Sequence, residues 1–437
     1  MKRHTPLAVL AITALFAGLI TGCGTSGGGG TSSGGASSSG PASSAAPTGK
    51  TTITFWHVYS KNFGATQIDD FIAQFNSTHD NIEVKGVYNA DMYPGLMTNL
   101  QAEVASGSYP SICMIGYNYL NYFAGNFKYQ DIKQMDKDGW LDSTFLPNIL
   151  SLAQANGAQL GVPMSISTPV LYYNADLFTK AGITAPPATW AEVQQDALKI
   201  KSATGKYGFY MQEYADNWAI QGLLESNGAR MLTDGKASFA SPEAAEAYKL
   251  LADMVLKDKS ALHVGADEGI AAFTSGEVGM LLGTSAKIGT ISDAAKFSLK
   301  AAPFPGFAGK EKRLPAGGNF LAITAQDAAE QQAALEFVKF IMQPENLTKW
   351  SAGMGYLPPR QDVSDALNQQ LKSGTVAELW QVAYSQMPTI YSWVSYPGDV
   401  GAFAEQTLAD TRDKILSGAD ITSTLQAAQD ALNQRLG

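Results

Sequence analysis

Cysteine is scarce in this chain of 437 residues, with Cys23 and Cys113 as its two cysteines. Two cysteines cannot form a disulfide framework, and an acylated Cys23 would leave no internal disulfide. Cys113 stands in the short apolar run Ser-Ile-Cys-Met-Ile, which is typical of a buried strand. We therefore expect Cys113 to be a packed core thiol rather than a reactive one.

Histidine is also scarce, and after the first 22 residues the chain has His57, His79 and His263, far apart in sequence. Residues 51–437 contain no His-Glu-x-x-His, no Gly-x-Ser-x-Gly, no phosphate loop and no paired-cysteine metal motif. We therefore expect no enzyme, no cofactor and no metal. A carbohydrate-acting enzyme stays open as the alternative of another class, because acids are plentiful and a glycosidase needs only a carboxylate pair.

Basic residues are too few for a nucleic-acid partner. Lys and Arg total 30 against 39 Asp and Glu, which gives a formal net charge of −9. Loss of residues 1–22 would remove Lys2 and Arg3 and no acid, so the charge would be about −11. Nucleic acids and acidic membrane surfaces require a basic footprint, so we expect neither as a partner.

Long apolar runs are missing beyond residues 7–20, which follow Lys2 and Arg3. A basic start followed by a short apolar segment is typical of an export signal, and the segment is too short to span a bilayer comfortably. It ends in small residues immediately before Cys23 and resembles a bacterial lipobox. The sequence therefore predicts a lipoprotein signal peptide at residues 1–22 and lipidation of Cys23.

Charge and large apolar groups are both absent from residues 24–49, which consist almost entirely of Gly, Ser, Thr, Ala and Pro. Such a segment cannot bury enough surface to offset its ordering entropy, so we expect residues 23–50 to form an acylated cysteine and a flexible tether. The tether would hold an exported body on the outer face of the cell membrane, or on the periplasmic side in a host with two membranes. The lipid would be its only membrane contact.

The remaining residues, nearly 390, suffice for two domains and alternate between strand and helix patterns. Strands are predicted at residues 52–56, 82–88, 112–115 and 170–173, and Thr189 and Glu192 have capping-box spacing. Apolar periodicity predicts helices at residues 68–75, 92–104, 190 onward, 217–228, 242–257, 266–275, 326–342, 378–387 and 420–436. The alternation predicts an α/β fold with parallel strands, and ligands in such folds gather at the carboxyl ends of strands.

Several segments, in order, resemble the extracellular solute-binding proteins of carbohydrate ABC importers (family 1). They are residues 53–57 (Ile-Thr-Phe-Trp-His), 168–174 (Thr-Pro-Val-Leu-Tyr-Tyr-Asn), 187–190 (Pro-x-Thr-Trp), 276–280 (Gly-Glu-Val-Gly-Met), 315–318 (Pro-x-Gly-Gly) and 355–358 (Gly-Tyr-Leu-Pro). The resemblance implies a two-lobed periplasmic-binding-protein-like fold of type II, with ligand between the lobes. It assigns residues 51–169 and about 302–343 to lobe 1, and 170–301 and about 344–437 to lobe 2. It also implies a monomer that delivers its ligand to the permease subunits of an ABC importer.

Within the family the chain most resembles the glycerol-3-phosphate-binding group, whose pocket residues have counterparts here at Tyr93, Trp218, Ser285, Gly318 and Tyr356. An acidic residue of that group falls at Tyr117. An arginine expected near residues 393–395 is absent, and no arginine occurs between residues 360 and 412. Because arginine is a favoured phosphate ligand, its absence favours a neutral sugar or oligosaccharide. A glycerol-3-phosphate or glycerophosphodiester ligand is the alternative.

A sugar site needs aromatic platforms for C–H faces and polar side chains for hydroxyls, and the predicted strand ends supply both. Together with the resemblance they give the candidate ligand-binding residues His57, Tyr59, Tyr93, Tyr117, Asn118, Ser165, Ser167, Trp218, Thr284, Ser285, Gly318, Asn319, Tyr356 and Trp393. Core packing is the alternative role for the aromatic members, and a structural role is the alternative for His57. A metal-binding role for the tyrosines at 117–122 would need a nearby histidine or acid cluster.

Overall fold

The computed structural model describes residues 49–437 apart from 62, 213–216, 372 and 399. The predicted signal peptide, Cys23 and nearly all of the predicted tether lie outside the described residues. Across the described ranges, no helix is both long enough and apolar enough to cross a membrane.

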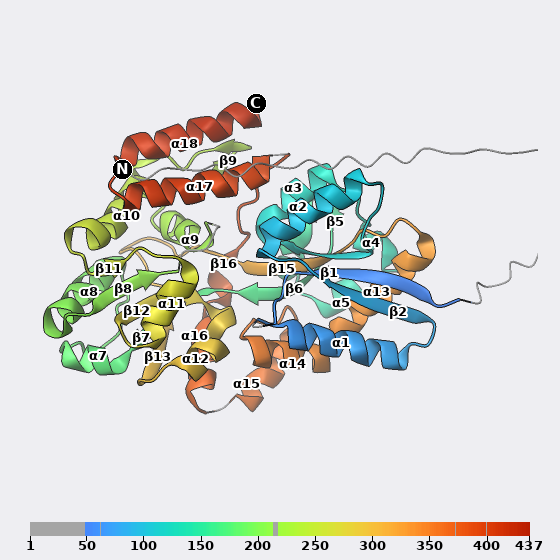
Figure 1. Cartoon of the computed structure of the whole chain (residues 1–437), viewed down its shortest axis with the longest axis horizontal. Helices are drawn as coiled ribbons and strands as arrows, with labels where there is room; N and C mark the ends of the chain where they lie inside the picture. The colour runs from blue at the N-terminus through green and yellow to red at the C-terminus, as the bar shows by residue number, and fades with distance from the viewer. Residues whose placement is uncertain (1–48, 62, 213–216, 372, 399) are drawn as a thin grey trace, which may run out of the picture. The chain divides into compact units, whose positions relative to one another are not determined.

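The first sheet of the body has five strands in the order β2-β1-β3-β15-β6 (Figure 1). Their bounds are β1 Thr51–His57, β2 Ile82–Tyr88, β3 Ile112–Gly116, β6 Val162–Ser167 and β15 Gly317–Ile323. The strands β2, β1 and β3 run parallel, whereas β15 runs antiparallel to both β3 and β6. Helix α1 (Ala65–Thr78) contacts β2, and α13 (Ala328–Ile341) contacts β1 and β15.

The second sheet also has five strands, in the order β11-β8-β12-β7-β13, and lies to the left in Figure 1. Their bounds are β7 Pro169–Asn174, β8 Tyr207–Met211, β11 Ala261–Leu262, β12 Val278–Thr284 and β13 Leu299–Pro303. Here β8 is parallel to β11 and β12, whereas β7 is antiparallel to β12 and β13. Thr168 alone separates β6 of the first sheet from β7 of the second, so the chain crosses directly between the sheets.

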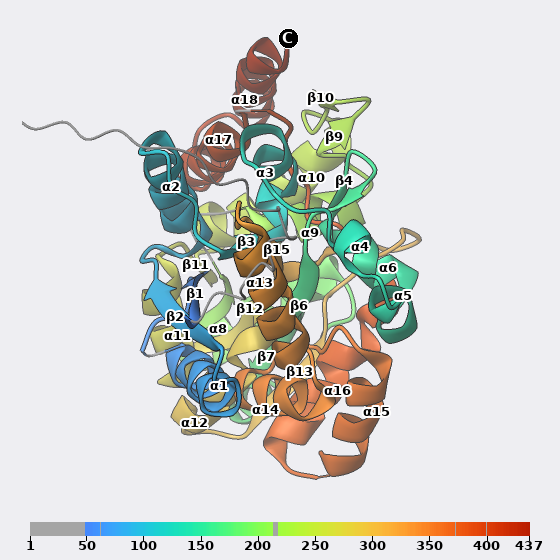
Figure 2. The same cartoon turned by 90° about the vertical axis from the view of Figure 1, so that its right-hand side faces the viewer.

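The other helices and short strands surround these two sheets (Figure 2). The helices are α2 Met92–Ala105, α3 Leu120–Asn126, α4 Ile132–Met135, α5 Trp140–Thr144, α6 Pro147–Leu150, α7 Ala175–Lys180, α8 Trp190–Thr204, α9 Trp218–Ser226, α10 Pro242–Ala252, α11 Ala266–Thr274, α12 Ile288–Ala294, α14 Pro344–Met354, α15 Gln361–Gln370, α16 Thr375–Ser385, α17 Val400–Leu416 and α18 Ile421–Leu436. The short strands are β4 Gln154–Ala155, β5 Ala158–Gln159, β9 Leu232–Thr233, β10 Lys236–Ala237, β14 Leu314–Pro315 and β16 Ile390–Tyr391. The body is therefore a two-lobed α/β fold, as predicted.

Local sequence signals explain where α8 begins and ends. Thr189 Oγ1 accepts a hydrogen bond from the Glu192 backbone N–H at 3.3 Å, and the Glu192 carboxylate accepts one from the Thr189 N–H at 3.0 Å. This reciprocal pair confirms the predicted capping box. Gly205, with a φ of +73°, ends the helix in the left-handed conformation that glycine adopts at no steric cost.

The prediction of parallel strands is confirmed for β1, β2 and β3, whereas β7 and β15 run antiparallel to their neighbours. The chain enters β7 directly from β6. It enters β15 after leaving the second sheet at β13. Neither strand therefore follows a helix that would return the chain parallel to the preceding strand. Each pairs antiparallel with its neighbours, since only a crossover connection brings a strand back parallel. Cys113 on β3 is a free thiol and is fully buried, as predicted.

Candidate functional site

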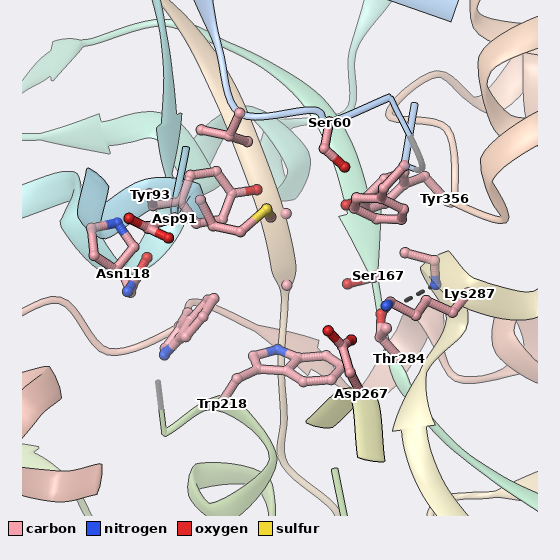
Figure 3. Close-up of a pocket in the computed structure, with 18 of the residues that line it drawn as sticks. Ser60, Asp91, Tyr93, Asn118, Ser167, Trp218, Asp267, Thr284, Lys287 and Tyr356 are labelled. Carbon is pink, nitrogen blue, oxygen red and sulfur yellow. Dashed lines mark hydrogen bonds between the residues drawn. The ribbon is translucent and has the colours of Figure 1, made fainter. Parts of the chain in front are cut away.

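A pocket of about 440 Å³ lies where the ends of the two sheets face each other, and both sheets and their loops contribute to its wall. In Figure 3, Asp91, Tyr93 and Asn118 lie on one side, Ser60 and Tyr356 on the other, and Trp218 and Asp267 below. Aromatic side chains form much of the wall: Phe63, Tyr88, Tyr93, Trp218, Tyr356 and Trp393. Such a wall, with a few polar groups among apolar surfaces, is typical of a small-molecule site.

The structure brings eight of the fourteen candidate residues to this pocket wall. They are Tyr93, Asn118, Ser167, Trp218, Thr284, Gly318, Tyr356 and Trp393. These eight residues come from segments far apart in sequence, from α2 to the segment after β16. The pairing of β6, β15 and β12 within the two sheets brings them to one pocket. Their contact with a ligand stays a prediction.

The other six candidates do not line the pocket, and three of them form a buried hydrogen-bonded layer behind it. Asn319 Nδ2 donates to the hydroxyls of Tyr59 and Tyr93, at 3.0 Å each. The hydroxyl of Tyr59 is 3.2 Å from Ser165 Oγ, which also accepts a hydrogen bond from Trp350 Nε1 at 3.1 Å. Through Asn319, this layer fixes the hydroxyl of Tyr93, which does line the pocket.

His57, Tyr117 and Ser285 are also withdrawn from the pocket wall, each for a packing reason. His57 lies between the rings of Phe55 and Tyr88, and burial lowers the pKa of its imidazole. Tyr117 is 1% exposed, and burial raises the pKa of its phenol well above the usual value. Ser285 Oγ accepts a hydrogen bond from the backbone N–H of Thr168 at the crossing between the sheets.

Two tryptophans lie next to each other in the wall. The indole of Trp218, at the start of α9, donates from Nε1 to the carbonyl of Pro315 at 2.9 Å, and its ring centroid lies 6.5 Å from that of Trp393. Glycine at 317 makes this packing possible, because a Cβ there would lie 2.9 Å from the Trp218 ring and 2.4 Å from Ser167 Oγ. Gly318 has a φ of +117°, and a Cβ on it would lie 2.0 Å from the Ser165 carbonyl oxygen, so neither position can carry a larger side chain.

Three charged residues of the wall were missed in the sequence. Asp91 follows β2, Asp267 lies in the first turn of α11, and Lys287 follows β12. Burial lowers the pKa of Lys287, an effect that the negative charge of Asp267 opposes. Asp91 has a sequence signal, because it is a polar residue in the loop after the predicted strand at residues 82–88.

The β2–α2 turn is backbone-strained at the pocket. Asp91 and Met92 are consecutive non-glycine residues with φ of +61° and +55°, and both line the wall. Such conformations cost of order 1–3 kcal/mol each and cluster at ligand sites.

Asn118 lines the pocket, but its side-chain oxygen is shielded from solvent. Its side chain is 3% exposed, and its Oδ1 has no hydrogen-bond partner among the described residues. A buried acceptor left unpaired costs about 1–3 kcal/mol.

A family model described as bacterial extracellular solute-binding protein matches residues 70–384. The chain belongs to this family. Among curated relatives of this solute-binding protein, the sn-glycerol-3-phosphate-binding periplasmic protein UgpB of Yersinia enterocolitica is 27% identical over 326 residues, covering 70% of this chain and 74% of the relative. The protein of the same name from Pectobacterium atrosepticum is 27% identical over 331 residues, covering 70% and 73%.

Solved structures with the same fold bind different ligands. UgpB of Mycobacterium tuberculosis, in complex with glycerophosphocholine, has a TM-score of 0.78 at 22% identity, covering 89% of this chain and 98% of its own. The cyclic α-maltosyl-1,6-maltose binding protein of Arthrobacter globiformis has a TM-score of 0.75 at 24% identity, covering 89% and 99%. The family match identifies the chain as a bacterial extracellular solute-binding protein, and the solved structures show that it has the fold of such proteins.

Proposed function

We propose that the protein captures a neutral sugar or oligosaccharide in the pocket between its lobes and delivers it to the permease of an ABC importer. The observation that carries the proposal is the adjacent pair of Trp218 and Trp393 in the pocket wall. Indole faces suit the C–H faces of a pyranose.

The charges in the wall support a neutral ligand over an anionic one. Asp91 and Asp267 are acidic, and of the described residues that line the pocket only Lys287 is basic. Carboxylates accept hydrogen bonds from sugar hydroxyls, whereas they repel a phosphate. The absence of arginine from residues 361–411 supports the same ligand class.

A glycerol-3-phosphate or glycerophosphodiester ligand is the second candidate. Lys287 places one ammonium group at the pocket, and the curated relatives are named for binding glycerol 3-phosphate. One lysine provides a point charge without the bidentate geometry of a guanidinium, which is why we rank this candidate second.

The remaining parts of the proposal concern location and assembly. We propose a signal peptide at residues 1–22, lipidation at Cys23 and a monomeric body with lobe boundaries as expected from the sequence, acting in binding rather than catalysis. The lipobox-like sequence before Cys23 supports the anchor. Metabolic labelling with a palmitate analogue, compared between wild type and Cys23→Ala, tests it directly.

A thermal-shift panel tests the ligand class. It compares maltose, maltotriose and glucose with sn-glycerol 3-phosphate and glycerophosphocholine, because a ligand at 100 times its Kd stabilises the folded state by about 2.7 kcal/mol. The proposal expects stabilisation by at least one sugar and none by the phosphate esters. Stabilisation by the esters alone would replace it with the second candidate, and release of cleaved oligosaccharide during incubation would indicate an enzyme.

A further inference from the structure

The segment 390–398, which we name the strap, carries Trp393 into the pocket wall between two anchored ends. At its start, β16 pairs in parallel with β14, and the Ala316 N–H donates to the Tyr391 carbonyl at 2.8 Å. Trp393 lies two residues later and is 5% exposed. Because β14 leads directly into β15, the strap is tied to the strand that carries Gly318 and Asn319.

Gln221 holds the strap on both sides of Trp393. This residue lies on α9, one helical turn after Trp218, and its side chain is 2% exposed. Its Nε2 donates to the Tyr391 hydroxyl at 3.1 Å, and its Oε1 accepts from the Val394 N–H at 3.2 Å. A primary amide can both donate and accept in this way, so one side chain fixes the residues two before and one after Trp393.

The far end of the strap is bound to α3, which follows the Asn118 turn. Ser395 Oγ accepts from the Asn121 N–H at 2.9 Å, and the Ser395 carbonyl accepts from Asn121 Nδ2 at 2.8 Å. Asn126 Nδ2 also donates to the Gly398 carbonyl at 3.0 Å. The strap therefore joins α9 to α3, with Trp393 in the middle.

We propose that Gln221 is a positioning residue for ligand binding: it sets the Trp393 indole against Trp218, and it acts on the ligand through Trp393. This rests on the proposed function of ligand capture, though not on the identity of the ligand. Gln221 does not line the pocket, so its effect on affinity must pass through the residues that it holds.

The first experiment needs no ligand. Full-length protein labelled with 5-fluorotryptophan is studied by ¹⁹F NMR, with the Trp218 and Trp393 signals assigned through Trp218→Phe and Trp393→Phe. Gln221→Met keeps the length of the side chain and removes both hydrogen bonds, so it should shift or broaden both signals. Tyr391→Phe, which keeps the ring beneath the Arg313 guanidinium at 4.2 Å, should give a smaller effect of the same kind.

Gln159→Met is the matched control. Gln159 is also a 2% exposed amide, with Nε2 donating to the Gly161 carbonyl at 2.7 Å and Oε1 accepting from Gln154, and it lies at β5 outside the pocket wall. It should lower stability without moving the Trp393 signal. An unchanged Trp393 signal in Gln221→Met would overturn the proposal.

The second experiment is a double-mutant cycle of Gln221→Met and Trp393→Ala, with Kd measured for maltotriose and for sn-glycerol 3-phosphate. Loss of two hydrogen bonds around the platform should weaken binding about 10-fold. Residues that act through one another are not additive, so Gln221→Met should cost little once Trp393 is alanine. Additive losses would contradict the proposal. If no sugar or ester of the thermal-shift panel binds wild type, the proposed function fails while the NMR experiment still decides the role of Gln221.

Discussion

Replacing Trp218 should weaken ligand binding in addition to lowering the stability of the fold. Trp218 is 4% exposed, so a ligand contacts only part of its ring, but truncating a buried aromatic anchor of a binding site typically costs about 2 kcal/mol of binding free energy. Since 1.4 kcal/mol corresponds to a tenfold change, Trp218→Ala should raise Kd about 30-fold. Titration calorimetry with the ligand identified in the thermal-shift panel measures this.

The same substitution affects folding, so stability must be measured separately. Trp218 is 4% exposed and donates to the Pro315 carbonyl, and a buried Trp→Ala change costs about 3–5 kcal/mol. Urea unfolding shows whether Trp218→Ala is still folded under the conditions of the titration. Trp218→Phe keeps an aromatic platform and loses the Nε1 donor, so its Kd should rise only about threefold.

Trp380→Phe provides the control for loss of an indole. Trp380 is 1% exposed on α16, outside the pocket wall, and its Nε1 has no hydrogen-bond partner among the described residues. Its replacement should change stability and leave Kd unchanged. An unchanged Kd in Trp218→Ala, or an equal loss in Trp380→Phe, would refute the assignment of Trp218 to the ligand platform.

Three further substitutions test the buried layer behind the pocket, the charge in its wall and the pH dependence of stability. Ser165→Ala removes the acceptor of Trp350 Nε1, so urea unfolding should show a loss of about 1–3 kcal/mol with little change in Kd. Asp267→Asn replaces a wall carboxylate, which accepts hydrogen bonds from sugar hydroxyls, by a neutral amide, so calorimetry should show the sugar binding about fivefold more weakly. Burial lowers the pKa of His57, so the unfolded chain takes up a proton at this residue before the folded chain does as pH falls. The free energy of unfolding should therefore decrease below about pH 6.5. Urea unfolding measured at several pH values should show a smaller decrease in His57→Gln.

The sequence pattern was informative wherever a strand ends and a loop begins. Asn118 and Thr284 were predicted because they follow strands, and both line the pocket. Tyr93, Trp218 and Tyr356 came from the family resemblance, since an aromatic residue in a helix or turn has no local signal that distinguishes a ligand platform from core packing.

The residues behind the pocket could not be separated from those in its wall by sequence. Ser165 and Ser167 lie two apart on β6 and therefore on the same face of the sheet, yet only Ser167 lines the pocket. Ser165 lies further from the strand end and is covered by Tyr59 and Trp350, which come from distant segments. The burial of Ser165 depends on tertiary packing, which cannot be predicted from strand periodicity.

Local sequence patterns did not predict the direction of β7 and β15 or the role of Gln221. Periodicity shows a strand without its partner, so the antiparallel pairing of both strands was not predicted. The strap, whose contacts with Gln221 and Asn121 no local pattern reveals, carries Trp393 into the pocket wall. Gln221 gains its two partners from residues about 170 positions later.

Titration calorimetry of the full-length protein with maltotriose and with sn-glycerol 3-phosphate, at low and at high salt, tests the ligand class most directly. A neutral ligand held by stacking and hydroxyl hydrogen bonds should bind with an affinity that salt leaves unchanged, whereas a phosphate held by Lys287 should bind less tightly as salt rises. We predict salt-independent binding of the oligosaccharide and none of the phosphate ester. Salt-sensitive binding of the ester, with no heat from the sugar, would contradict the assignment of the pocket to a neutral sugar.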